Sequence, residues 1–250
     1  MNPQPTRLPI SAVALDLDGT MLDTAGDIAG AVDAALVSLG QAPLGPAVVR
    51  GFIGQGVIHL LRTSLTRAAL GVEPSDELLV QGQVAFTREY QRGLCRTTVF
   101  YPGALEGLQA LRAAGFPLAC VTNKPARFTD PLLAGLGLTD FFALVISGDT
   151  LPVKKPEPGQ LLHAARLLGV APERLLVVGD SMHDLRAARA AGCPVYCVSY
   201  GYTEDPELLA RQADAALDSL ADIAGRIVRS DLTPGFAPHS GAGPNPALIS

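Results

Sequence analysis

The sequence predicts an α/β fold: a doubly wound, parallel-sheet (Rossmann-like) core with a helical domain inserted after the first strand. Three observations lead to this prediction. Short, nearly continuous apolar runs recur along the 250 residues, as is typical of strands buried on both faces of a parallel sheet. A segment with helical spacing of its apolar residues follows each run. Finally, about 100 residues separate the first two runs, whereas a strand with its crossover helix needs only about 30.

Five strands are expected, at residues 12–15, 118–121, 144–146, 175–178 and 195–198. Helices between them end at glycines that act as stop signals, at positions 115, 169 and 192. Pro131 would break one long helix, so two helices are expected there, the second beginning at Pro131 with Asp130 as its N-cap. The alternation of strands and helices implies an open sheet covered by helices on both faces.

The inserted segment spans residues 24–98 and carries helical patterns at 28–39, 57–70 and 78–90, with no convincing strand. It divides the α/β core into residues 10–23 and 99–230. The chain crosses between the two parts near residues 24–26 and 98–102, and two crossings on one side make a natural hinge. Residues 1–9 are expected to form a flexible lead-in. The stretch 231–250, rich in proline, glycine and serine, is expected to be a disordered tail.

The composition excludes several classes of protein. Hydrophobic types make up 48% of the chain and charged types 17%, which excludes a chain that is mainly disordered. The formal net charge of −5 gives no reason to expect nucleic-acid binding, which usually needs a basic face. No apolar run approaches the roughly 20 residues of a membrane-spanning helix, and the N-terminus lacks a secretory pattern. We therefore expect a soluble, cytoplasmic protein that binds neither nucleic acid nor membranes. Its oligomeric state is not readable from the sequence.

Polar residues follow four of the predicted strands at their carboxyl ends, where open α/β sheets bind ligands. They are Asp16 and Asp18 after the first strand, Thr122, Asn123 and Lys124 after the second, Lys154 and Lys155 after the third, and Asp180 and Asp184 after the fourth. Carboxylates gathered in one place are ionised at neutral pH and repel one another, so the cluster needs a cation. Several charged oxygen ligands suit Mg²⁺, which also binds substrate phosphate.

The lysines add a place for an anion. Among 19 basic residues only Lys124, Lys154 and Lys155 are lysines, and all three follow the second and third strands. A lysine ammonium is a compact point charge suited to phosphate. With hydroxyl, amide and backbone N–H donors it makes a cradle for a phosphoryl group, whose charge is spread over three oxygens.

These residues resemble the four motifs of the haloacid dehalogenase superfamily over about residues 10–229. Within the superfamily the chain is most similar to the phosphoglycolate phosphatase family. The similar stretches are Tyr101-Pro102-Gly103, Val121-Thr122-Asn123-Lys124-Pro125, Lys154-Lys155-Pro156-Glu157-Pro158, Gly179-Asp180-Ser181 and Tyr200-Gly201-Tyr202. The position of the insertion matches that family's helical cap. His183 departs from the pattern, because relatives more often have asparagine there.

The resemblance implies the chemistry of the acidic residues. Asp16 is expected to be the nucleophile, forming an aspartyl-phosphate that splits one difficult displacement into two. Asp18 is expected to protonate the leaving alkoxide and then deprotonate the attacking water. The implied Mg²⁺ ligands are the Asp16 carboxylate, the Asp18 backbone carbonyl and Asp180. Asp184 is expected to support these ligands without binding the ion directly.

The resemblance also assigns the groups around the phosphoryl oxygens. Thr122 and Asn123 are expected to bind those oxygens. Lys155, the lysine of the Lys-Pro-x-Pro pattern, is expected to stabilise the nucleophile and the developing charge, with Lys154 as the alternative lysine.

Substrate choice is expected to come from the inserted domain, which would close over the site and exclude water. The loop at residues 50–56 resembles the family's cap loop and precedes a helical pattern. A helix N-terminus near Gly56 could receive a small carboxylate. Gly54 and Gly56 are therefore candidate substrate-binding residues, together with Arg50, which could pair with that carboxylate.

The function implied by the resemblance is hydrolysis of a small phosphorylated acid, 2-phosphoglycolate, to glycolate and phosphate. Asp18 argues against a haloalkanoate dehalogenase, which has no use for a second motif aspartate. The absence of lysine between residues 24 and 98 excludes a phosphonoacetaldehyde hydrolase, which needs a cap lysine. Three alternatives stay open: a phosphatase for another small phosphomonoester such as a sugar phosphate, a sugar-phosphate mutase, and a non-catalytic binding protein on the same fold.

Overall fold

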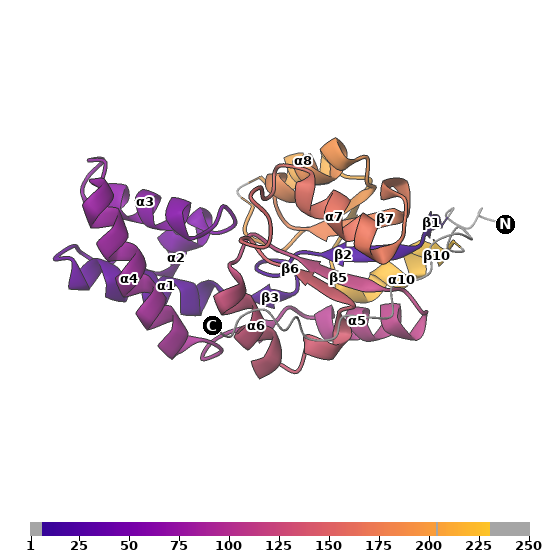
Figure 1. Cartoon of the computed structure of the whole chain (residues 1–250), viewed down its shortest axis with the longest axis horizontal. Helices are drawn as coiled ribbons and strands as arrows, with labels where there is room; N and C mark the ends of the chain where they lie inside the picture. The colour runs from indigo at the N-terminus through magenta and orange to yellow at the C-terminus, as the bar shows by residue number, and fades with distance from the viewer. Residues whose placement is uncertain (1–6, 204, 231–250) are drawn as a thin grey trace, which may run out of the picture.

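A six-stranded parallel sheet forms the centre of the protein, in a computed structural model that describes residues 7–203 and 205–230 (Figure 1). The strands lie in the order β6 (Leu144–Ile146), β5 (Leu118–Val121), β2 (Ala12–Leu15), β7 (Leu175–Gly179), β8 (Val195–Val198) and β9 (Ala215–Leu217). From β2 the chain first builds outwards through β5 and β6, and then returns to the other side of β2 with β7. The strand order therefore reverses next to β2, and this switch point is where open α/β sheets bind ligands.

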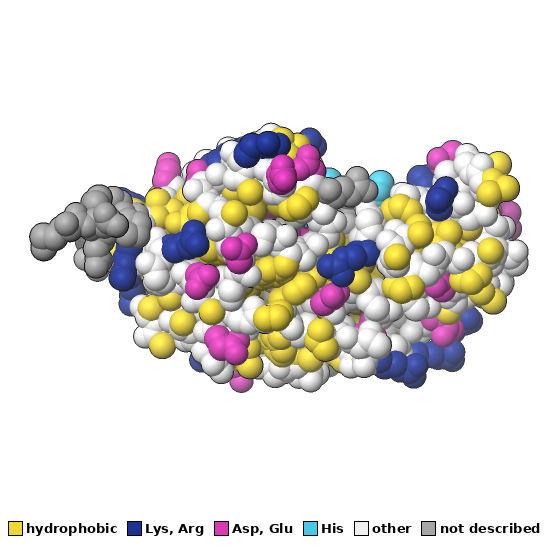
Figure 2. All heavy atoms as spheres, turned by 180° about the vertical axis from the view of Figure 1, so that it is seen from behind, with side chains coloured by type: hydrophobic (Ala, Val, Ile, Leu, Met, Phe, Trp, Pro, Cys, Tyr) yellow, Lys and Arg dark blue, Asp and Glu magenta, His cyan; other side chains and the backbone are white. Residues whose placement is uncertain are grey.

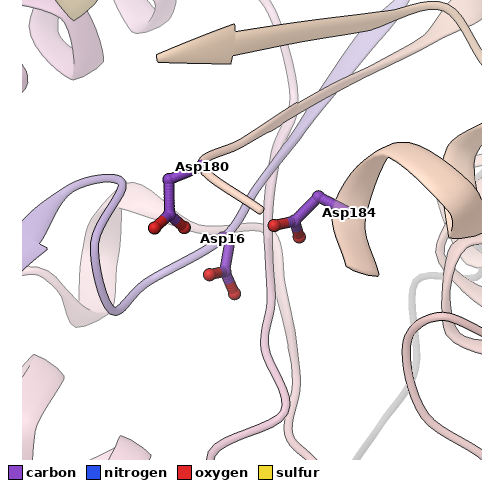
Figure 3. Close-up of side chains that lie close together, drawn as sticks. All are labelled: Asp16, Asp180 and Asp184. Carbon is purple, nitrogen blue, oxygen red and sulfur yellow. The ribbon is translucent and has the colours of Figure 1, made fainter. Parts of the chain in front are cut away.

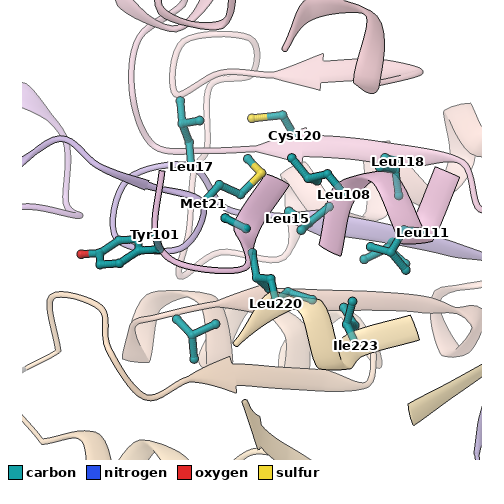
Figure 4. Packing of buried hydrophobic residues seen from close by; sticks show 14 of the residues in the cluster. Leu15, Leu17, Met21, Tyr101, Leu108, Leu111, Leu118, Cys120, Leu220 and Ile223 are labelled. Atoms are coloured by element: carbon teal, nitrogen blue, oxygen red, sulfur yellow. The ribbon is translucent and has the colours of Figure 1, made fainter. Parts of the chain in front are cut away.

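The alternation of side chains along β2 separates two hydrophobic layers. Val13 and Leu15 face a layer formed with α5 (Ala104–Ala113), α6 (Ala126–Gly135) and α10 (Ile223–Arg226). Ala12 and Ala14 face a second layer formed with α7 (Gly159–Leu168), α8 (Met182–Ala191) and α9 (Pro206–Gln212). In Figure 4, Leu108 of α5 packs close to Leu15 in the first layer. Both faces of the sheet are thus covered, which confirms the predicted doubly wound architecture.

The segment after β2 is helical. It contains α1 (Ala25–Ser38), α2 (Pro46–Val49), the 3₁₀ turn η1 (Arg50–Phe52), α3 (Val57–Ala68) and α4 (Asp76–Gly93). These helices lie beside the sheet (Figure 1) and share a separate hydrophobic cluster that includes Val32, Leu61 and Phe86, joined by Phe128 from α6. The helical patterns of the sequence are confirmed here, while the division of the chain into two domains stays a prediction.

The two chain crossings lie side by side. β3 (Leu22–Asp23) and β4 (Val99–Phe100) pair as a short antiparallel ribbon. Next to it, the Asp27 carboxylate of α1 accepts four hydrogen bonds of 2.6 to 3.1 Å from the backbone N–H and hydroxyl groups of Thr97 and Thr98. Burial alone would raise the pKa of Asp27, but these hydrogen bonds outweigh it and lower that pKa.

Two expectations for the core are wrong. Residues 8 and 9 are not a flexible lead-in, because Leu8–Ile10 forms β1 and pairs in parallel with β10 (Ile227–Arg229). Pro131 does not start a second helix capped by Asp130; it lies inside the single helix α6. A proline there removes one backbone hydrogen bond, and full burial of Leu132 and Leu133 just beyond it favours the continued helix. The expected tail at residues 231–250 lies outside the described residues.

Acidic and basic side chains are both distributed over the face of the molecule drawn in Figure 2. In residues 7–203 and 205–230, no helix combines the length and the apolar character needed to cross a bilayer.

Candidate active site

Three carboxylates meet at the switch point of the sheet. Asp16 directly follows β2, and its backbone N–H still donates to the carbonyl of Val178 at 2.9 Å, so it lies where the β2–β7 pairing ends. Asp180 directly follows β7, and Asp184 lies in the first turn of α8. One carboxylate oxygen from each of the three lies within 4.8 Å of the others (Figure 3).

Local structure fixes the two carboxylates that follow β7. Ser181 is the N-cap of α8 and forms a capping box: its backbone N–H donates to Asp184 Oδ2 at 3.2 Å, and its hydroxyl accepts from the Asp184 N–H at 3.4 Å. The Ser181 hydroxyl also donates to Asp184 Oδ2 at 2.6 Å. Asp180 Oδ2 accepts from the backbone N–H of Tyr202 at 2.7 Å, and its other oxygen accepts from the Thr20 hydroxyl at 3.2 Å. At Gly179 a Cβ would collide with the Asp184 side chain, so only glycine lets this carboxylate approach the strand end.

Lys155 balances part of the negative charge. Its ammonium donates to Asp16 Oδ1 at 2.7 Å, to Asp184 Oδ1 at 2.6 Å and to the carbonyl of Val121 at 2.8 Å, and its side chain is only 3% exposed. Burial would lower the pKa of Lys155, but Asp16 and Asp184 outweigh it and raise that pKa. The lysine is therefore a permanent cation in the site.

One ammonium does not balance three carboxylates. Burial raises the pKa of Asp16 to about 7, with the nearby Asp184 adding to the effect and Lys155 opposing it. Burial and the negative charges of Asp184 and Asp16 also raise the pKa of Asp180 well above its usual value. The donor set consists of carboxylate oxygens with excess negative charge, which is the chemistry that a hard divalent cation such as Mg²⁺ prefers. The residues present therefore fit the expected metal.

Asp18 belongs to a second cluster. Both of its carboxylate oxygens accept from the Lys124 ammonium, at 3.0 and 3.1 Å, and Oδ1 also accepts from the Thr24 hydroxyl at 2.6 Å. The same ammonium donates to the hydroxyl of Tyr90 on α4 at 2.6 Å. Sequence reasoning missed Tyr90, since within a helical pattern it reads as an ordinary core aromatic.

Thr122 and Asn123 lie at the end of β5 and line a cavity of about 50 Å³ that also reaches Asp16 and Asp18. The Asn123 amide nitrogen donates to the carbonyls of Gly54 and Lys155, both at 2.9 Å, and its oxygen accepts from the Lys155 N–H at 3.0 Å. Asn123 thus ties the loop that carries Lys155 to the loop from the helical segment.

Gly54 and Gly56 line the same cavity, but Arg50 does not approach it. The Arg50 guanidinium donates to Asp23 at 3.3 Å and to the Tyr101 hydroxyl at 3.1 Å, and it stacks over the ring of Tyr202. In this arrangement Arg50 is bound to core residues outside the cavity, and its pairing with a substrate carboxylate stays a prediction. Its partner Asp23 lies 27 residues away, and no local pattern pointed to it.

The structure distinguishes the two candidate lysines. Lys155 reaches Asp16, whereas the Lys154 ammonium donates to the carbonyl of Gln55 at 2.8 Å. Lys154 therefore contacts the loop of the helical segment and not Asp16.

Comparison with known proteins gives consistent matches. The family model described as haloacid dehalogenase-like hydrolase matches residues 10–192. The chain is 47% identical over 223 residues to a phosphoglycolate phosphatase of Nitrosospira multiformis, covering 89% of this chain and 98% of that one. It is 44% identical, with the same coverage, to a phosphoglycolate phosphatase of Thiobacillus denitrificans.

Solved structures show the same architecture. A crystal structure described as a predicted phosphoglycolate phosphatase from Haemophilus somnus has a TM-score of 0.82 and 31% identity, covering 86% of this chain and 97% of that one. A putative beta-phosphoglucomutase from Thermotoga maritima has a TM-score of 0.67 and 26% identity, covering 86% and 97%.

Proposed function

Because the chain belongs to the haloacid dehalogenase-like hydrolases and is a phosphoric monoester hydrolase, we propose that it converts 2-phosphoglycolate and water to glycolate and phosphate with Mg²⁺. The observation that carries the proposal is the position of Asp16. Its carboxylate lies at the end of β2, bonded to Lys155 and within 4.8 Å of oxygens of Asp180 and Asp184. The substrate is suggested by the relatives named phosphoglycolate phosphatase, and we place the reaction in the cytoplasm.

In the first step, an oxygen of Asp16 attacks phosphorus, and the bond between phosphorus and the glycolate oxygen breaks. Asp18 gives its proton to the departing oxygen, which leaves as the glycolate hydroxyl. Lys155 orients the Asp16 carboxylate and stabilises charge on the phosphoryl oxygens. Mg²⁺, held by Asp16, Asp180 and the Asp18 backbone carbonyl and supported by Asp184, would supply positive charge that offsets the repulsion between two anions.

In the second step, water attacks the phosphorus of the aspartyl-phosphate, and Asp18 accepts a proton from that water. Phosphate leaves and Asp16 is regenerated. Thr122 and Asn123 line the same cavity as Asp16 and are proposed to bind phosphoryl oxygens. To do so, Asn123 has to break one of its hydrogen bonds to Gly54 or Lys155. We propose that residues 24–98 act as a cap, with Gly54 and Gly56 at its contact with the core.

Phosphate release from a panel of small phosphomonoesters, with and without Mg²⁺, tests the proposal. The expected result is metal-dependent release with the highest kcat/KM for 2-phosphoglycolate. A higher kcat/KM for a sugar phosphate would identify that ester, and not 2-phosphoglycolate, as the substrate. No phosphate release from any ester with Mg²⁺ present would reject the proposed phosphatase activity.

A sugar-phosphate mutase is the second candidate, because the Thermotoga maritima structure carries that description at 26% identity. A mutase returns the phosphoryl group to a sugar instead of passing it to water. Formation of an isomeric sugar phosphate without net phosphate release would support that candidate.

A further inference from the structure

Lys124 is a buried cation paired with Asp18, a residue that the proposed reaction needs at the leaving group. Its side chain is 5% exposed, and its ammonium bonds to both oxygens of Asp18 and to the Tyr90 hydroxyl. Because the ammonium is buried and lies within 3.1 Å of both Asp18 oxygens, it needs an anion beside it.

In this arrangement Asp18 is not free to serve the leaving group, because Lys124 and the Thr24 hydroxyl together bind both of its oxygens. For proton transfer at the substrate, the carboxyl group has to turn away from Lys124. That movement would leave a charged ammonium in a pocket lined by Ile28, Phe86 and Phe128. Removing one partner from a buried ion pair is strongly unfavourable, so a second anion has to take the place of Asp18.

We propose that the carboxylate of the substrate is this second anion: it binds Lys124 and Tyr90, displaces Asp18 from Lys124 and thereby frees Asp18 for proton transfer. This inference rests on the proposed function, because it requires a phosphorylated acid as substrate. It makes Lys124 a specificity-determining residue, since a phosphomonoester without a carboxylate leaves Asp18 bound.

The cavity is suited to such a tail. It runs from Asp16 and Asp18 to Lys124 and Tyr90, and Lys124 is the only cation among the described residues that line it. The apolar side chains of Ile28, Phe86 and Phe128 surround this end of the cavity, so a short tail that carries one carboxylate finds its charge partner only at Lys124.

Tyr90 adds a second donor. Because its hydroxyl oxygen accepts from Lys124, its own hydrogen is available, and the hydroxyl donates to no acceptor within the described part of the chain. Burial raises the pKa of Tyr90 to about 12, so the hydroxyl keeps this hydrogen near neutral pH. The tyrosine can therefore donate to a carboxylate oxygen beside the ammonium.

The test compares two substrates of similar size, 2-phosphoglycolate and 2-hydroxyethyl phosphate, in which a neutral CH₂OH group replaces the carboxylate. The measured quantity is the ratio of their kcat/KM values in the full-length protein with Mg²⁺. In Lys124→Met the ratio of 2-phosphoglycolate to 2-hydroxyethyl phosphate should fall about 100-fold, and in Tyr90→Phe about tenfold, as expected for lost hydrogen bonds to a charged group. Lys154→Met is the matched control, because it removes an ammonium that donates to the Gln55 carbonyl and not to Asp18 or Tyr90, and it should leave the ratio unchanged.

The outcomes separate this inference from the proposed function. If the unaltered protein does not hydrolyse 2-phosphoglycolate, the proposed function fails. If it does, and Lys124→Met lowers kcat/KM equally for both substrates, Lys124 merely positions Asp18 and the inference is overturned. Should Lys124→Met not fold, Tyr90→Phe decides alone, since it keeps the ring that packs against Phe86 and Phe128; an unchanged ratio in that variant would also overturn the inference.

Discussion

Lys155→Met removes the only ammonium in direct contact with the Asp16 and Asp184 carboxylates among the described residues, while keeping a side chain of similar length. Three hydrogen bonds of 2.6 to 2.8 Å disappear with it, and two buried carboxylates lose their cation. Removing one partner from a buried ion pair costs about 3–5 kcal/mol. Because both carboxylates belong to one network, the two losses are not additive, and we expect the metal-free protein to lose about 3–5 kcal/mol in its free energy of unfolding.

Urea unfolding with and without Mg²⁺ measures this effect. A ligand that binds only the folded protein stabilises it, and Mg²⁺ should stabilise Lys155→Met more than the unaltered protein, because it supplies positive charge where the ammonium is missing. Lys154→Met is the matched control: it removes a half-buried ammonium that donates to one backbone carbonyl and contacts no carboxylate of the site, so it should lose less than about 1 kcal/mol. A loss below about 1 kcal/mol in metal-free Lys155→Met would refute the reasoning, and so would an equal gain from Mg²⁺ in the two proteins.

Two further predictions concern the metal and the loop at residues 50–56. In the metal-free protein the Asp16 carboxyl group has a pKa of about 7, so below that pH it holds a proton that Mg²⁺ has to displace. The dissociation constant of Mg²⁺, measured by calorimetry, should therefore rise up to about tenfold per pH unit below 7. A dissociation constant that does not change between about pH 5 and 7 would contradict the raised pKa. Gly56→Ala would strain a backbone at φ +89° and place a methyl group 2.6 Å from the Lys154 ammonium, so kcat/KM for 2-phosphoglycolate should fall about tenfold. Gly40→Ala, also at positive φ but with open space around it, should leave kcat/KM unchanged. Equal effects of the two substitutions would mean that the loop at residues 50–56 has no specific role in activity.

The strands and the acidic cluster could be predicted because their signals are local. The apolar runs at 12–15 and 175–178 are visible without any partner, and the parallel arrangement brings the residues after them to one edge of the sheet. Asp16 and Asp180 follow those runs directly, so their meeting required only the strand order. The preference for Lys155 over Lys154 came from the family resemblance; Lys155 is the lysine that contacts Asp16, while its catalytic role stays a proposal.

Features that depend on distant partners could not be predicted. β1 exists because Leu8 pairs with Ile227 at the other end of the chain, and its proline-rich sequence gives no sign of that. Tyr90 becomes part of the site only because α4 lies against the loop that carries Lys124. Pro131 is a local signal for the start of a helix. It nevertheless lies inside α6, where the leucines that follow it are buried.

The most direct test of the central claim is whether Asp16 takes up the phosphoryl group. Rapid acid quenching of the enzyme during turnover of 2-phosphoglycolate with Mg²⁺, followed by peptide mass spectrometry, should find one phosphoryl group on the peptide that contains Asp16. The Asp16→Asn protein should carry no phosphoryl group on this peptide and should no longer hydrolyse the substrate. An Asp16→Asn protein that hydrolyses the substrate at the unaltered rate would contradict the account.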